Sequence, residues 1–108
     1  MREIPESDWR LFRAVREAAL DRYCARVLEE SAAILADEGE TNRERYVRLY
    51  RLLAKRDRTL ADTFNNPRRS VARTQLAQMD ALGLVTDIEL ARFSPDTRDS
   101  VRRIRSAW

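Results

Sequence analysis

The sequence predicts an all-α protein, built as a long antiparallel helical hairpin with a smaller C-terminal helical cluster. Apolar residues recur every three or four positions, which is the period of a helix, and no strand-like alternation is present. Only two glycines and three prolines interrupt the 108 residues, too few for the many turns of an all-β chain. We expect one domain over residues 1–108, because this length suits a single core.

The first helix is predicted from about Glu6 or Asp8 to about Glu38. Ser7 is a candidate N-cap, and Gly39 is placed to stop the helix. Charges on its polar face are spaced for i,i+4 pairs, Arg26 with Glu30 among them. Its apolar stripe is Phe12, Val15, Ala19, Tyr23, Val27, Ile34 and Leu35, widened by Leu20, Cys24 and Leu28.

The second helix begins in a capping box, Thr41-Asn-Arg-Glu44, in which each side chain accepts a hydrogen bond from the other residue's backbone N–H. It ends at the Asn65-Asn66-Pro67 sequence. Its predicted apolar stripe consists of Tyr46, Leu49, Tyr50, Leu53, Leu60 and Phe64.

The third helix is predicted to follow at once, with Asn66 as its N-cap and Pro67 at its first position. Gly83 should end it, and Leu84 is placed for the apolar contact of a Schellman turn. The apolar positions between these ends are Val71, Ala72, Leu76, Met79 and Leu82.

Two shorter helices are predicted in the remaining chain. The Thr86–Glu89 segment has the spacing of a second capping box and should open a helix to about Arg92. Ser94 and Pro95 fit the N-cap and first position of a last helix, which should reach about Arg105. We expect Trp9 to pack the start of the first helix onto this cluster.

The first helix would be about 48 Å long at ~32 residues, whereas a compact domain of this size has a radius of gyration near 13 Å. The helix must therefore kink, project as half of a hairpin, or be covered by a second copy. Its wide apolar stripe favours the last two solutions, so we expect a homodimer.

The residues that most catalytic and metal sites need are scarce. Histidine is absent and Cys24 is the single cysteine, which removes the commonest general base and any Cys/His zinc site within one chain. Gly39 and Gly83 stand alone and form no phosphate-binding loop. We expect Cys24 to be buried and inert, and we expect no catalytic site, no metal and no cofactor.

Asp57 falls on the second stripe between Leu53 and Leu60, where an apolar residue is expected. Three interpretations are open: an exposed stripe edge, an ion pair with an arginine, or a buried carboxylate with a raised pKa. The ion pair is favoured because arginines are abundant nearby.

Positive charge is concentrated in the second half of the chain. Residues 1–50 hold nine basic and eleven acidic side chains, whereas residues 51–108 hold twelve and seven. Arg68 and Arg69 should lie in a helical first turn, whose free N–H groups bind anions. The candidate anion or nucleic-acid site in the basic region 43–73 consists of Arg48, Arg51, Lys55, Arg58, Arg68, Arg69 and Arg73. A solvated face that pairs with the acidic first helix is the competing and favoured interpretation.

Residues 76–90 read Leu76-x-x-Met79-x-x-Leu82-Gly83-Leu84-Val85-Thr86-x-x-Glu89-Leu90. This stretch resembles the short helix–turn–helix hairpins that end many bacterial proteins, including the SHOCT-type module. The whole chain resembles small uncharacterised bacterial all-helical proteins with an Asp-Trp near the start, here Asp8-Trp9, and a Gly-Leu-x-Thr turn. The resemblance implies a helical fold and no activity.

Two classes of function are consistent with these features. The first is a small cytoplasmic protein-interaction module acting as a homodimer, because amphipathic helices supply an apolar stripe. The alternative is a nucleic-acid or anion binder that uses the basic region 43–73 through phosphate contacts. No apolar run approaches the ~20 residues of a membrane span, and the charged first twenty residues do not fit a secretory signal.

Overall fold

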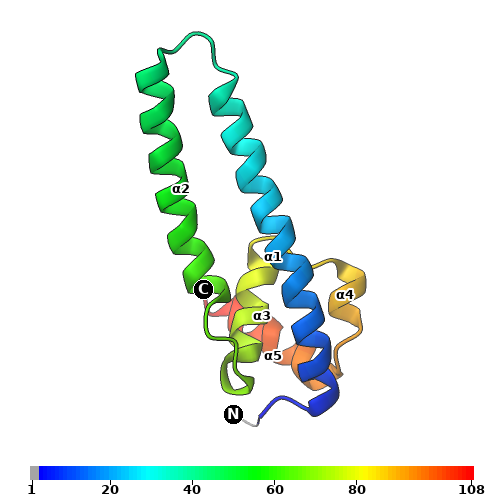
Figure 1. Ribbon diagram of the computed structural model, residues 1–108. Coiled ribbons are helices and arrows are strands. Elements are labelled where there is room, and N and C mark those ends of the chain that lie inside the picture. Colours follow the sequence, from blue (N-terminus) through cyan, green and yellow to red (C-terminus); the bar gives the residue numbers. More distant parts are fainter. Residues whose placement is uncertain (1–2) are drawn as a thin grey trace.

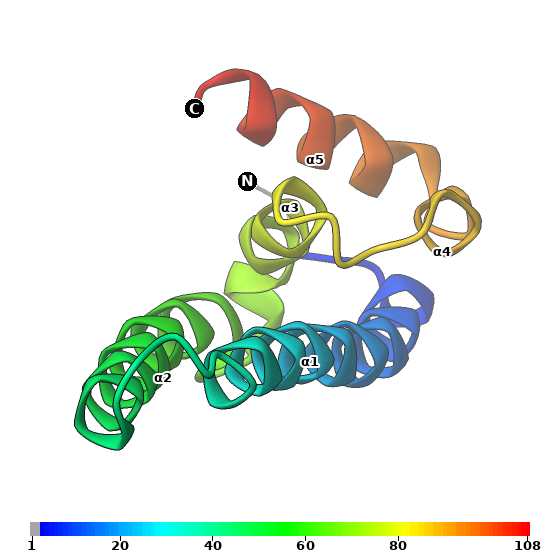
Figure 2. The same ribbon diagram turned by 90° about the horizontal axis from the view of Figure 1, so that it is seen from above.

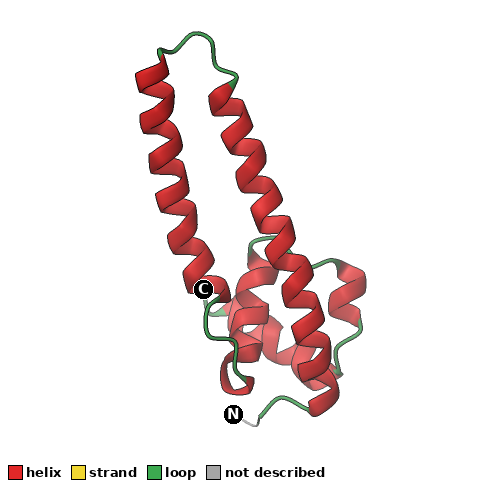
Figure 3. Ribbon diagram, in the orientation of Figure 1, coloured by secondary structure: helices red, strands yellow, loops and turns green. Residues whose placement is uncertain are grey.

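The computed structural model describes residues 3–108, and within this range the chain forms helices and loops but no strand (Figure 3). The predicted all-α class is therefore confirmed. The helices are α1 (Glu6–Leu35), α2 (Asn42–Phe64), the short 3-10 helix η1 (Arg69–Val71), α3 (Ala72–Ala81), α4 (Asp87–Ala91) and α5 (Pro95–Ser106). In the part of the chain described, no helix combines the length and the apolar character needed to cross a bilayer.

Helices α1 and α2 form an antiparallel hairpin, and the later helices lie on one side of it (Figures 1 and 2). The molecule measures 53 × 23 × 23 Å, and its radius of gyration of 16.7 Å exceeds the ~13 Å of a compact domain this size. The hairpin therefore projects beyond the cluster, as predicted. We call residues 24–62 the arm and the rest of the described chain the base.

The hydrophobic core lies in the base. The N-terminal half of α1, the last turn of α2, and α3 to α5 all contribute to it. Its largest apolar side chains are almost fully buried; they are Phe12, Phe64, Leu76, Met79, Leu84, Phe93 and Val101.

The ends of α1 differ from the prediction. The N-cap is Pro5, whose carbonyl accepts a 2.9 Å hydrogen bond from Trp9, and Ser7 lies exposed within the first turn. At the other end α1 stops at Leu35, three residues before Glu38. The Asp37 carboxylate accepts a 3.1 Å bond from the Gly39 N–H and so turns the chain before the glycine is reached.

The capping box of α2 is confirmed. The Thr41 hydroxyl accepts a 3.1 Å bond from the Glu44 N–H, and the Glu44 carboxylate accepts a 3.2 Å bond from the Thr41 N–H. These bonds satisfy backbone donors that the first helical turn leaves free. The hairpin loop is thereby joined to α2 by local chemistry alone.

The start of α3 was predicted wrongly, whereas its end was predicted correctly. Asn66 takes a left-handed φ of 53°, and α3 begins only at Ala72, after η1. At the end, Gly83 has a φ of 71°, which favours glycine. The Leu84 N–H donates to the Met79 carbonyl at 2.9 Å, the bond that defines a Schellman turn.

The caps of the last two helices are also confirmed. The Thr86 hydroxyl accepts from the Glu89 N–H at 3.0 Å, and Glu89 accepts in return from the Thr86 N–H at 2.9 Å. Ser94 caps α5, with Pro95 in its first turn. Local side-chain chemistry was sufficient to place both helices.

Among residues 3–108, four arginines donate to backbone carbonyls at the C-terminal ends of helices. Arg16 reaches Phe64 at the end of α2 (2.6 Å), and Arg45 reaches Leu35 at the end of α1 (2.6 Å). Arg26 reaches the Leu82 carbonyl at 2.6 Å and the Gly83 carbonyl at 2.7 Å, both just after α3. The fourth is Arg98, which donates to the Ala91 carbonyl of α4 at 3.2 Å. Because these carbonyls lack partners within their own helices, cations there are favourable.

The predicted ion pair between Arg26 and Glu30 is not formed. Arg26 is occupied by the end of α3, and Glu30 instead accepts two bonds from Arg56 of α2, at 3.1 and 2.8 Å. Arg26 and Glu30 therefore hold other helices, although Arg10 still pairs with Glu6 along α1 at 3.7 Å.

A buried carboxylate fastens α1 to α5. Asp8 accepts a 3.1 Å bond from the Ser94 N–H, a 2.5 Å bond from the Ser94 hydroxyl and a 2.6 Å bond from the Thr97 hydroxyl. Burial raises the pKa of Asp8, but these hydrogen bonds and the charge of Arg73 outweigh burial and leave that pKa below its usual value. The neighbouring Trp9 stacks on Phe12 at 5.6 Å, beneath the guanidinium of Arg69.

Candidate docking face on the arm

The arm exposes large apolar side chains along one face. Leu28 and Leu35 of α1 and Tyr46, Tyr50 and Leu53 of α2 are between 45% and 68% exposed. All five belong to the apolar stripes that the sequence predicted on the first two helices. We call these five residues the outer face.

The outer face lies on the side of the hairpin away from the base. Arg26, which contacts the end of α3, is two residues from Leu28 and so points in nearly the opposite direction, about 200° around the helix. Figure 2 shows α3, α4 and α5 together on the other side of the α1–α2 layer. No described segment of the chain covers the outer face.

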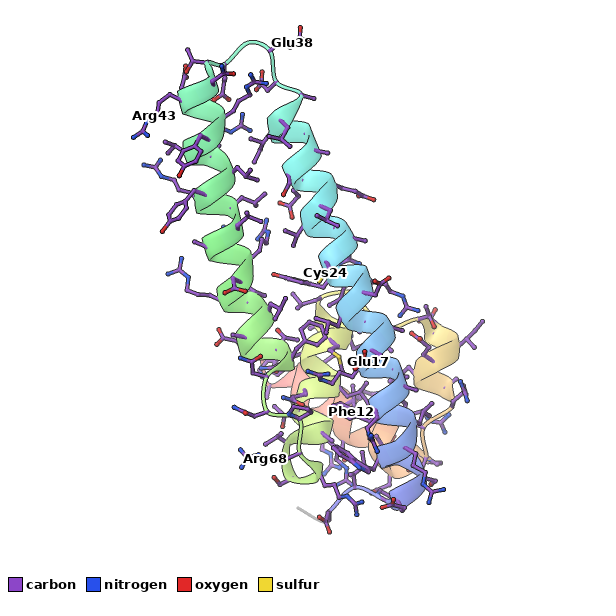
Figure 4. The ribbon with its side chains drawn as sticks, in the orientation of Figure 1. Phe12, Glu17, Cys24, Glu38, Arg43 and Arg68 are labelled. Atoms are coloured by element: carbon purple, nitrogen blue, oxygen red, sulfur yellow. The ribbon has the colours of Figure 1, made fainter. Side chains whose placement is uncertain are left out.

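A groove of about 570 Å³ runs between α1 and α2 along this face. Its walls are mainly apolar and aromatic, and the arm with its side chains is drawn in Figure 4. The lining residues are Tyr23, Cys24, Val27, Leu28, Tyr50, Leu53, Ala54, Arg56, Asp57 and Leu60. Cys24, expected to be buried, is only half-buried in this lining.

Asp57 lies at the groove and is exposed. Within residues 3–108 no ion pair joins it to an arginine, so the favoured interpretation of Asp57 was wrong. The neighbouring Arg56 turns toward α1 instead, where it binds Glu30. Asp57 is therefore a charged residue at the exposed edge of an apolar stripe.

Polar contacts join α2 to α1 on the side where the two helices face each other. The Tyr23 hydroxyl donates to the Arg56 carbonyl at 2.8 Å, beside the pair of Arg56 with Glu30. The hydrogen bond from Arg56 lowers the pKa of Glu30, and the same bond raises the pKa of Arg56. The groove walls are thereby fixed to each other without use of the outer face.

The basic residues predicted on α2 form a row on a different side of that helix. Arg48, Arg51, Lys55 and Arg58 follow one another at spacings of three and four, so they share a helical face. Arg48 is engaged at the arm tip by Asp37, at 3.1 Å, and by Glu40. The other three are exposed.

The remaining predicted residues lie apart from this row, in the base. Arg69 pairs with Glu6 at 2.9 Å and covers the Trp9 ring, while Arg68 is exposed in the connection before η1. Arg73 is only 5% exposed and pairs with Asp96 at 2.9 Å. The structure therefore does not assemble the seven residues into one surface. Arg68 and Arg69 lie at the start of the three-residue η1 and not in the first turn of α3.

No group of three His, Cys, Asp or Glu side chains in the described range is close enough to hold a metal ion. In the acidic loop at the arm tip, Asp37 and Glu40 both bind Arg48. No protein-family model, curated protein or solved structure matches this chain. The resemblance drawn from residues 76–90 and from Asp8-Trp9 stays a prediction.

The sequence analysis expected an apolar stripe for a second copy to cover but did not locate the exposed residues, because a helical period shows which residues share a face and not what covers that face. It also missed the binding role of Asp8, which it named only as a possible start of the first helix and as part of Asp8-Trp9. Its true partners, Ser94 and Thr97, lie 86 and 89 positions away. No local signal could have connected them.

Proposed function

We propose that this protein is a small cytoplasmic protein-interaction module that acts as a homodimer, with the outer face of the arm as its docking surface. The observation that carries the proposal is an apolar face, exposed along more than two turns of each helix, beside a groove of about 570 Å³. Contiguous apolar surface of this kind marks interaction sites in soluble proteins. Tyrosines, of which the face holds two, are enriched in interface cores.

The proposal assigns no catalytic role. Many charged side chains cap helices or pair between helices. The groove is therefore lined by few polar groups, which supports a docking role. Half-burial of the single cysteine suits a reducing compartment, where thiols stay free.

Nucleic-acid binding is the alternative, and the row of Arg51, Lys55 and Arg58 is the observation that favours it. Three exposed cations can neutralise only about three phosphates, so the salt dependence and the affinity would be modest. Two acidic residues lie on the same row: Glu44 is four residues before Arg48, and Asp62 is four residues after Arg58. Their negative charge opposes phosphate binding. We therefore prefer the protein-interaction function.

Sedimentation equilibrium of the full chain tests the proposal. The wild type should form dimers, whereas Leu28→Glu combined with Leu53→Glu should be monomeric. Both side chains are largely exposed, so the variant should retain its helical circular dichroism. Ile88→Glu is the matched control, because Ile88 is 79% exposed on α4, outside the outer face. A monomeric wild type, or a double variant that still dimerises, would overturn the proposal.

A further inference from the structure

The exposed edge of α2 has the spacing of a coiled-coil seam. Tyr46, Tyr50, Leu53, Asp57 and Leu60 follow at intervals of four, three, four and three residues. This alternation keeps side chains in line along a helix that packs against another helix. Leu60, at the base end of the seam, is partly buried against the core, whereas Tyr46, Tyr50, Leu53 and Asp57 stay exposed. The polar contacts of α2 with α1 are made through Arg56 on another side of the helix. Helix α2 is thus built to pack on two sides and is packed on one.

Opposite charges lie at equal distances on the two sides of Tyr50 along this face of α2. Arg43 and Asp57 both lie seven residues from Tyr50, one toward the arm tip and the other toward the base. Seven residues are one heptad, so both share the side of α2 that carries Tyr50. Both side chains are exposed, and Arg43 is labelled near the arm tip in Figure 4.

Helix α1 adds to the same charge pattern. Asp21 is seven residues before Leu28, on the row that leads to Leu35, and it is exposed. The bond from Tyr23 to Arg56 places this part of α1 beside Asp57. Along the outer face, Asp21 and Asp57 therefore lie toward the base and Arg43 lies toward the tip, with apolar residues between.

We propose that a second copy of this chain packs on the outer face with its hairpin antiparallel, so that α2 crosses its counterpart near Tyr50. This inference rests on the proposed function and names the partner's orientation. In the antiparallel arrangement Arg43 of each copy faces Asp57 of the other, which gives two opposite-charge contacts. A parallel arrangement would bring Arg43 to Arg43 and Asp57 to Asp57, and like charges oppose such pairing.

The arrangement determines the form of the dimer. Two hairpins would close a four-helix arm around the shared groove, and the two bases would lie at opposite ends of it. Charged residues beside the apolar positions set orientation in helical pairs. Asp57, a charged residue on an apolar stripe, thereby helps to select the antiparallel orientation.

Disulfide trapping tests the orientation. The full chain carrying Cys24→Ser and one new cysteine, either Arg43→Cys or Asp57→Cys, keeps one of the two charges that set the orientation. Positions 43 and 57 are about 21 Å apart along one helix, beyond the ~7 Å limit between Cα atoms of a disulfide. Any such bond is therefore between copies. Oxidation of a mixture of the two single-cysteine chains should join one of each.

The single-cysteine chains alone separate the possible outcomes. Self-linking of the Arg43→Cys chain would show a parallel dimer and overturn the inference. If the wild type dimerises but the cysteine chains form no cross-link, the antiparallel orientation is overturned and the proposed function stays intact. A monomeric wild type would overturn both.

Charge reversal gives a second readout that does not depend on cysteine. Arg43→Glu or Asp57→Arg should each raise the dimer Kd by about tenfold, because two contacts become repulsive. The two changes combined should restore the wild-type Kd. Arg51→Glu, on the other side of α2, is the control and should change the Kd little. Failure of the combined variant to recover would contradict the antiparallel pairing.

Discussion

The arm and the base use the same kinds of residues with opposite results. In the base, α1 buries Phe12, Val15 and Ala19 under three further helices. In the arm, the same helix buries only Ser31 and Ile34, and Leu28 and Leu35 remain exposed. The apolar period is continuous along α1, so periodicity does not cause the difference. The decisive factor is whether a second layer of helices is present.

This difference implies that the base supplies most of the folding free energy, while the arm supplies surface. Burial of apolar area is the main favourable term in folding. A residue contributes through burial only where its side chain leaves water. Substitutions in the two regions should therefore differ sharply in their cost.

The largest expected effect is on the core of the base. Phe12→Ala should lower the free energy of unfolding by about 3 to 5 kcal/mol, because it leaves a cavity where the ring is fully buried. Leu35→Ala, on the arm, should cost the monomer about 0.5 kcal/mol or less. Urea unfolding followed by circular dichroism measures both values. Equal losses would show that the arm and the base are equally packed.

The next effect concerns Asp8, which is buried and holds Ser94 and Thr97. Asp8→Asn should lower the free energy of unfolding by about 2 to 3 kcal/mol at neutral pH, because hydrogen bonds to a charged acceptor are lost.

This difference should depend on pH. The pKa of Asp8 is lower in the folded than in the unfolded chain, so its contribution is complete above the unfolded pKa and is lost as pH falls through the folded pKa. The gap between wild type and Asp8→Asn should therefore narrow below about pH 4. A gap that stays constant down to about pH 2 would exclude a contribution from the charge.

The smallest effect concerns the arginines at helix ends. Arg16→Ala should cost about 1 kcal/mol, because the Phe64 carbonyl at the end of α2 loses its donor. Arg13, an exposed arginine on the same helix, is the matched control, and Arg13→Ala should change the stability by less than about 0.5 kcal/mol. Thermal unfolding of the two variants makes the comparison. Equal shifts would deny Arg16 a capping role.

The parts of the fold that the sequence predicted correctly are those set by neighbouring residues. Both capping boxes, at Thr41 and Thr86, join residues three positions apart. The Schellman turn at Gly83 and the Ser94 cap are equally local. In such motifs the partner is in the same few residues, so the sequence holds all the information that the hydrogen bond needs.

The predictions that failed include some local ones, the Ser7 cap among them, and several that concern partners distant in the chain. Arg26 was expected to pair with Glu30, but the free carbonyls after α3 bind it instead. Pro67 was expected to open α3, but the chain turns through Asn66 and α3 starts later. Arg73, predicted as an anion ligand, is buried against Asp96. The position of a basic residue in the sequence does not indicate which carboxylate or carbonyl oxygen will accept its hydrogen bonds in the fold.

The sequence by itself determined the helical class, the hairpin, and most of the points at which helices begin and end, because period and capping act over a few residues. Only the tertiary structure decided which apolar residues are buried. Leu28 and Phe12 are alike as members of one helical stripe, yet one is 68% exposed and the other fully buried. The physical reason is that burial depends on which surface lies opposite, and α3 to α5 cover only one side of the hairpin.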